Sequence, residues 1–202
     1  MSELHDLINN NLIQGKIFFD KSLENLTWLK VGGKAACLYI PKNKEDLAVF
    51  LKHIDSNVRI SVFGRLSNVL IRDGGISGVT ILIPPSFSEI EIHKNNKITL
   101  GSGLLDKNVS QYAYDNNLGG FEFLSGIPGN IGGAIAMNAG CYGSEIKDIA
   151  DEVLILERDG ELKSYNNEEM NFSYRNSVIK ADQIIIEATF QGRHENKSNI
   201  KE

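Results

Sequence analysis

The stretch from Glu122 to Gly140 is the part of the sequence with the strongest indication of ligand chemistry. Its glycines let the main chain adopt positive φ angles and approach a ligand closely, while Pro128 stiffens the loop. The Gly-Gly-Ala that follows can open a helix whose free N–H groups face an anion. Such a stretch suits a pyrophosphate or a flat ring system. The alternative, a glycine-rich connection that only turns the chain, stays open at this point.

Two further segments carry side chains suited to phosphate or carboxylate chemistry. Between Phe63 and Gly75, a polar loop presents Ser67 and Asn68, whose hydroxyl and amide groups can bind phosphate oxygens. A simple hairpin turn explains this segment more economically. In Asn171–Ser177, a tyrosine and an arginine stand side by side and offer a phenol and a permanent cation. An arginine at this position is also typical of a surface ion pair.

Short strands mixed with a few helices predict an α+β fold with two lobes. Apolar spacing predicts an N-terminal helix within residues 1–15 and an extended segment over 25–33. A helix is expected over 44–54, with Asn43 as its N-cap, and another with Asp106 as its cap. The remaining strands are expected at 36–40, 59–63, 69–72, 79–83, 90–93, 98–100, 153–156, 162–165 and 184–190, with hairpins joining 90–93 to 98–100 and 153–156 to 162–165.

The double proline at 84–85 is the expected boundary between the lobes. We therefore predict an N-terminal extension over 1–22, a first lobe over 23–84, a second lobe over 85–192 and a frayed polar tail over 193–202. The early strands lack both the G-x-G-x-x-G fingerprint and the Walker A pattern, so any nucleotide cofactor would be held by another architecture.

Composition favours a cytoplasmic globular protein that binds neither nucleic acid nor membrane. The net charge is -5, and the basic residues are scattered rather than gathered in a stripe. No apolar run reaches the length of a signal peptide or a bilayer span. Cys37 and Cys141 stand apart, which suits a reducing cytosol, and the four dispersed histidines predict no metal site.

Several segments spaced along the chain together resemble the UDP-N-acetylenolpyruvoylglucosamine reductase family. The resemblance is carried by Thr27–Gly33, by Ser67-Asn68 with Arg72–Gly75, and by Glu122–Gly143 with Ile146, and it extends to Tyr174-Arg175-Asn176-Ser177. It covers roughly residues 23–190. The resemblance implies a two-lobed FAD-binding fold of the p-cresol methylhydroxylase type. In this family NADPH reduces a non-covalently held FAD, which then reduces the enolpyruvyl group of a UDP-sugar to give UDP-N-acetylmuramate for peptidoglycan.

The resemblance also implies roles for particular residues. Arg175 matches the catalytic arginine that would stabilise the enolate, and Tyr174 matches a tyrosine that contacts substrate. The residues implied to bind FAD are Gly64, Arg65, Ser67, Asn68, Ser125, Gly126, Ile127, Pro128, Gly129, Gly132, Gly133, Ala134, Asn138, Ala139, Gly140 and Ile185.

The sequence departs from the family pattern in two places. Leu66 stands where the family has a glycine, and a side chain at a position of positive φ costs on the order of 1 kcal/mol, so FAD binding is expected to weaken. The family's substrate-closing domain, with its proton-donating serine, is expected after Phe190 and has no counterpart there. The alternatives are therefore an impaired reductase, a non-catalytic FAD-binding fragment, or a half-enzyme that receives the third domain in trans. A different flavin oxidase of the same fold is disfavoured by the Tyr174-Arg175 pair.

Overall fold

A computed structural model describes residues 12–200, and these form two compact units. Unit 1 holds the described residues up to Ser86 together with Leu156–Lys163 and Lys180–Ile184. Unit 2 holds the rest of the described chain. The main break lies just after the proline pair, but two later segments return to unit 1.

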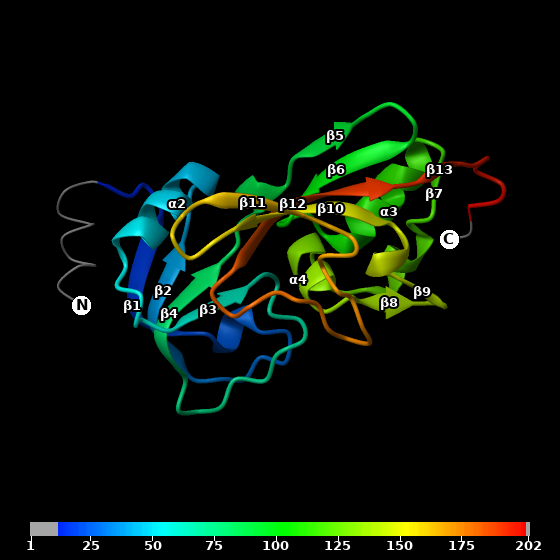
Figure 1. Ribbon diagram of the computed structural model, residues 1–202. Helices are drawn as coiled ribbons and strands as arrows, with labels where there is room; N and C mark the ends of the chain where they lie inside the picture. The colour runs from blue at the N-terminus through cyan, green and yellow to red at the C-terminus, as the bar shows by residue number, and fades with distance from the viewer. Residues whose placement is uncertain (1–11, 201–202) are drawn as a thin grey trace. The chain divides into compact units, whose positions relative to one another are not determined.

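A four-stranded sheet forms the centre of unit 1, with the strand order β1-β2-β4-β3 (Figure 1). Strand β1 pairs antiparallel with β2, whereas β2 and β3 both pair parallel with β4. The elements of this unit, and the short helix at its end, are β1 (Lys16–Ser22), η1 (Glu24–Leu26), β2 (Lys34–Ile40), α2 (Lys44–His53), β3 (Ile60–Phe63), β4 (Ile76–Leu82) and η2 (Pro85–Phe87).

Helix α2 forms where the sequence predicts it. The Asn43 side chain accepts a hydrogen bond from the Asp46 N–H at 2.9 Å, which satisfies one of the free donors at the helix start. On the buried face, the Phe50 ring stacks on Tyr39 of β2 at a centroid distance of 3.9 Å. The apolar spacing therefore predicted both the helix and the face that it buries.

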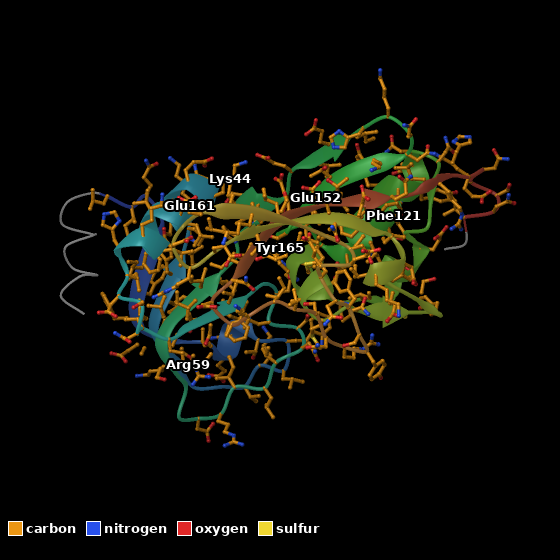
Figure 2. All side chains as sticks on the ribbon, in the orientation of Figure 1. Lys44, Arg59, Phe121, Glu152, Glu161 and Tyr165 are labelled. Atoms are coloured by element: carbon orange, nitrogen blue, oxygen red, sulfur yellow. The ribbon has the colours of Figure 1, made fainter. Side chains whose placement is uncertain are left out.

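Unit 2 is built on a five-stranded sheet with the order β11-β10-β12-β6-β5 (Figure 1). Its core includes Phe121, labelled in Figure 2, which packs edge-to-face against Phe190. The remaining elements of the chain are β5 (Ile90–Ile92), β6 (Lys97–Gly101), α3 (Asp106–Asp115), β7 (Leu118–Gly119), η3 (Glu122–Gly126), α4 (Ile131–Ala136), β8 (Gly140–Cys141), β9 (Ser144–Glu145), η4 (Ile146–Asp148), β10 (Ala150–Leu156), β11 (Leu162–Asn166), β12 (Ile184–Gln191) and β13 (Arg193–His194).

Both predicted hairpins are present. Strand β5 pairs antiparallel with β6, and β10 lies next to β11 in the sheet. Strand β12, predicted from its continuous apolar run, lies at the centre of the sheet between β10 and β6. Its residues Ile184, Ile185 and Ile186 are all buried, as expected of a strand covered on both faces.

Two predicted extended segments are wrong. Residues 69–72 form a loop, because the Arg72 carbonyl accepts hydrogen bonds from Gly33 and Gly75 instead of joining a strand ladder. Residues 25–33 form a 3-10 turn followed by tight bends. There the Thr27 hydroxyl accepts the Val31 N–H at 3.2 Å, which draws the chain into a compact loop.

The start of helix α3 and the C-terminal tail also differ from expectation. Helix α3 begins at Asp106 itself, with Leu105 at the N-cap, so the aspartate does not cap the helix with its side chain. The tail is more ordered than predicted: β13 pairs with β7, and Ile200 is buried. The helix predicted within residues 1–15 lies almost wholly outside the described residues.

Candidate functional site

The glycine-rich stretch forms a fixed surface loop, because apolar side chains on both sides of it are buried. Phe123 and Leu124 anchor it before the loop, and Ile131 anchors it at the start of α4. Between these anchors, the Ser125–Gly126 segment and Pro128 are exposed to solvent. The exposed main chain is therefore held in place by side chains that face the core of unit 2.

Backbone hydrogen bonds join the second half of this loop to the segment that follows β6. The Ile131 N–H donates to the Leu104 carbonyl at 2.9 Å, and the Gly132 N–H donates to the Ser102 carbonyl at 2.9 Å. The Asn130 side-chain amide donates to the same Ser102 carbonyl at 2.8 Å. These bonds fix the register between the glycine-rich stretch and the sheet.

Asp106 lies under this junction and is fully buried. Its backbone N–H donates to the Gly129 carbonyl at 3.3 Å, but its two buried carboxyl oxygens have no hydrogen-bond partner among the described residues. Burial raises the pKa of the Asp106 carboxyl to about 8, and the nearby Gly129 N–H offsets this in part. The side chain is thus mostly protonated at neutral pH.

Gly126 is a point of close approach within the site. A Cβ atom at this position would lie 2.6 Å from Cys141 Sγ and 2.9 Å from the Tyr142 ring, which is closer than real Cβ contacts allow. The Cys141-Tyr142 turn therefore packs directly on the main chain of Gly126. By contrast, a Cβ atom on the exposed Gly133 would meet nothing nearer than Asn130 Oδ1 at 3.5 Å.

The 171–177 loop, which we call the arginine loop, is tied to the glycine-rich stretch by Arg175. Its guanidinium donates from Nη1 to the Asn138 carbonyl at 3.3 Å and from Nη2 to the Gly140 carbonyl at 3.1 Å. The guanidinium also lies 5.1 Å from the centre of the Tyr174 ring, which is 84% exposed. Arg175 thus lies against main chain that is predicted to support the cofactor, and the exposed Tyr174 ring lies beside Arg175.

Several predicted cofactor residues of unit 2 are buried rather than exposed. Ala134 and Ile185 are part of the apolar core, and Ile127 and Ala139 are partly buried against it. Asn138 is fully buried as well. Such side chains would support the surface of a ligand site from beneath. Their assignment as cofactor-binding residues stays a prediction.

The other predicted phosphate loop, Gly64–Asn68, belongs to unit 1. Leu66 has a φ of 53°, in the left-handed region that the resemblance implied for this position. Its side chain is only 4% exposed and packs in a cluster with Leu23 and Leu38. Arg65 and Asn68 on either side are exposed. The main chain of the loop thus has a glycine-like conformation even though leucine occupies the position.

Sequence reasoning missed the hydrogen bonds of Asn138 and the burial of Asp106. The sequence does contain a signal for the neighbouring helix η4. Glu145 and Asp148 form a reciprocal capping box at its start, with the three-residue spacing typical of that motif. The role of Asn138 left no such signal, because its partners come from two separate loops. Within residues 12–200, no group of three or more His, Cys, Asp or Glu is placed to hold a metal ion, and no helix is long and apolar enough to cross a membrane.

Comparison with known proteins gives a family match over most of the chain. Residues 35–166 match the model of the FAD binding domain. The chain is 42% identical over 189 residues to a UDP-N-acetylenolpyruvoylglucosamine reductase of Rickettsia canadensis, covering 94% of this chain and 64% of that protein. A reductase of the same name from Orientia tsutsugamushi is also 42% identical, with the same coverage of both chains. The chain thus spans about two thirds, 64%, of the length of these curated relatives.

Solved structures give the same result for the fold. The crystal structure of UDP-N-acetylenolpyruvylglucosamine reductase from Thermus caldophilus superposes with a TM-score of 0.79 at 28% identity, over 93% of this chain and 65% of that one. BBE-like 1 from Physcomitrella patens superposes with a TM-score of 0.66 at 14% identity, over 96% of this chain and 44% of the other, and shows the fold alone.

These matches confirm the predicted α+β fold of the p-cresol methylhydroxylase type. They also confirm the resemblance that the glycine-rich stretch and the arginine loop suggested. The chain is similar over nearly its whole length to the UDP-N-acetylenolpyruvoylglucosamine reductases named above. It therefore belongs to the family of FAD binding domains.

Proposed function

We propose that this chain holds FAD non-covalently and forms the flavin-binding part of a UDP-N-acetylenolpyruvoylglucosamine reductase. The observation that carries the proposal is the pair of hydrogen bonds from Arg175 to the Asn138 and Gly140 carbonyls. They bring the residue implied to act on substrate onto the loop implied to support the cofactor. The family match and the curated relatives support the same conclusion.

The residues of the glycine-rich stretch fit a flat, anionic cofactor. Ser125 and Gly126 offer exposed main chain, and Gly133 leaves open space where a side chain would otherwise stand. In unit 1, the loop from Gly64 to Asn68 has the left-handed backbone at Leu66 that such a phosphate loop requires. Within unit 1, we infer that Gly64, Ser67 and Asn68 can contact phosphate oxygens. Within unit 2, we infer that residues 125–133 can face a flat ring system or a phosphate.

When bound, FAD would supply hydride transfer between NADPH and the enolpyruvyl double bond of UDP-N-acetylglucosamine enolpyruvate. The protein's own contribution is electrostatic and positional. Arg175 carries a permanent charge that can stabilise negative charge developing on the substrate carboxylate, a term worth several kcal/mol in a water-poor site. Tyr174 presents an exposed phenol beside it for contact with the substrate. The product would be UDP-N-acetylmuramate, a precursor of peptidoglycan.

Titration with FAD is the first test of the proposal. The purified chain should develop a flavin absorbance band that persists through desalting. A protein that stays colourless and leaves the fluorescence of added FAD unchanged would refute the proposed cofactor.

Turnover is the second test, and it separates the reductase from a binding module. NADPH oxidation that depends on UDP-N-acetylglucosamine enolpyruvate should be measured with the chain alone. It should be measured again with the part of a relative that this chain does not match. Activity only in the mixture would indicate a half-enzyme, and FAD binding without activity in either case would indicate a cofactor-binding module.

A further inference from the structure

Asn138 has a fully buried side chain that uses both of its amide hydrogens. Its Nδ2 donates to Glu145 Oε2 at 3.0 Å and to the Ser173 carbonyl at 3.0 Å. Its Oδ1 accepts the backbone N–H of Lys147 at 2.9 Å. With both N–H groups donated inside the protein and no exposed surface, this side chain is committed to structure rather than to a ligand.

The same residue also contacts the arginine loop through its main chain. The Asn138 carbonyl accepts a hydrogen bond from Arg175, while the Asn138 amide holds the carbonyl of Ser173, two residues earlier. Ser173 and Asn176 in turn exchange backbone hydrogen bonds at 3.0 and 3.1 Å. The turn that carries Tyr174 and Arg175 is thus closed on itself and fastened to Asn138 at its first residue.

Asn138 and Arg175 both have a strained backbone conformation, and the hydrogen bonds between them help to stabilise it. Asn138 has a φ of 41° and Arg175 a φ of 55°, and non-glycine residues in this region cost on the order of 1 kcal/mol or more. Asparagine tolerates this region better than most residues, whereas arginine has no such preference. The hydrogen bonds to Asn138 offset the cost at Arg175 and keep its guanidinium on the glycine-rich stretch.

We propose that Asn138 is a positioning residue, whose side-chain amide fixes the arginine loop so that Arg175 points along the glycine-rich stretch. This inference rests on the proposed function for the role of Arg175, but the contact itself can be tested without any cofactor. It also gives Asn138 a different part from direct contact with FAD.

Trypsin provides the test, because it cleaves after arginine only when the side chain is free to enter its pocket. We would follow cleavage of the 175–176 bond in the full chain by mass spectrometry and normalise it to cleavage after Lys94, in the exposed β5–β6 turn. Asn138→Gly keeps the left-handed backbone accessible and removes the amide. We expect its normalised rate at Arg175 to rise about tenfold, as follows from losing buried hydrogen bonds.

Two further variants keep the test specific. Asn138→Asp preserves size but places a carboxylate against Glu145 and the Ser173 carbonyl, so it should also expose Arg175 at pH 8. Asn117→Gly is the matched control, since Asn117 has a φ of 57° at the end of α3 and takes no part in the arginine loop. Its normalised rate at Arg175 should equal that of the wild type.

A general loss of stability would raise cleavage after lysines and arginines throughout the chain, whereas release of the arginine loop raises cleavage at Arg175 selectively. A folded Asn138→Gly or Asn138→Asp protein that is cut at Arg175 at the wild-type ratio overturns the proposal. Failure of both variants to fold also overturns it, because Asn138 would then support the whole unit rather than one loop. FAD titration of the wild type is read separately, so a chain that binds no FAD would end the proposed function and leave this result intact.

Discussion

Replacement of Leu66 by glycine should destabilise the protein, although glycine is the residue that the family pattern has at this position. Two opposing terms decide the outcome. The φ of 53° favours glycine, and relief of this strain is worth about 1–2 kcal/mol. The buried side chain favours leucine, since truncating a buried leucine to alanine costs about 3–5 kcal/mol.

The environment of Leu66 indicates that the packing term is the larger. Its side chain is 4% exposed and lies in a cluster with Leu23, Leu38 and Ile71. We therefore expect Leu66→Gly to lower the free energy of unfolding by about 1–4 kcal/mol. Leu66→Ala keeps the strain and loses the packing, so it should be less stable than the glycine variant by about 1 kcal/mol.

Urea unfolding followed by circular dichroism measures these differences. Trp28 is the only tryptophan in the sequence, and its backbone N–H donates to the Leu66 carbonyl at 3.2 Å, so its fluorescence reports on this loop. Leu70→Ala serves as the control in the same loop, because Leu70 is 73% exposed and should change stability by less than about 0.5 kcal/mol.

Ligand binding gives an independent check on the same reasoning. Since the Leu66 side chain faces the core, its removal opens no new space on the exposed side of the loop. Leu66→Gly should then bind FAD no more tightly than the wild type. A glycine variant that is more stable than the wild type, or one that binds FAD about tenfold more tightly, would refute the account of this position.

Three other predictions concern single side chains. Burial raises the pKa of Asp106 in the folded protein to about 8, above its unfolded value of 3.8, so its contribution to stability is complete below pH 4 and is lost as the pH rises to about 8. The urea midpoint of Asp106→Asn should therefore fall less than that of the wild type between pH 5 and pH 8. Equal slopes for the two proteins would contradict this. Burial raises the pKa of the Cys37 thiol to about 11, so iodoacetamide at pH 8 should modify the half-buried Cys141 first, and equal rates by mass spectrometry would argue against the described burial. Gly126→Ala should cost about 1–3 kcal/mol in urea unfolding because of the contact with Cys141, whereas the control Gly74→Ala, with no atom within 4 Å of the added Cβ, should not.

The sequence predicted the elements whose signals are local. Helix α2 was predicted from Asn43 and the apolar spacing after it, and the hairpins were predicted from alternating strands around short polar turns. Residues 69–72 were misread because Val69, Leu70 and Ile71 are typical of a strand. The Arg72 carbonyl finds its partners at Gly33 and Gly75, and no local sequence pattern indicates that pairing.

Long-range pairing limits what can be predicted about domains in the same way. Two segments, Leu156–Lys163 and Lys180–Ile184, return to unit 1 after the chain has entered unit 2. In the first, Arg158 donates to the carbonyls of Ile54 and Asp55 at the end of α2, about a hundred residues earlier. A single boundary at Pro84-Pro85 assigns all later residues to the second lobe, so it cannot predict that these two segments belong to unit 1.

The candidate site shows why its residue types could be predicted but their roles could not. Glycines and a Tyr-Arg pair can be recognised in the sequence itself, because what they can do follows from the residue type and not from distant contacts. The part played by Asn138 depends instead on Ser173 and Lys147, which lie in two separate segments later in the chain. If this stretch binds FAD as proposed, such contacts would order its main chain before the ligand binds, which lowers the entropy cost of binding. Preorganisation of this kind needs residues that hold a binding loop in place from inside the protein, and the buried, fully hydrogen-bonded amide of Asn138 is suited to that part.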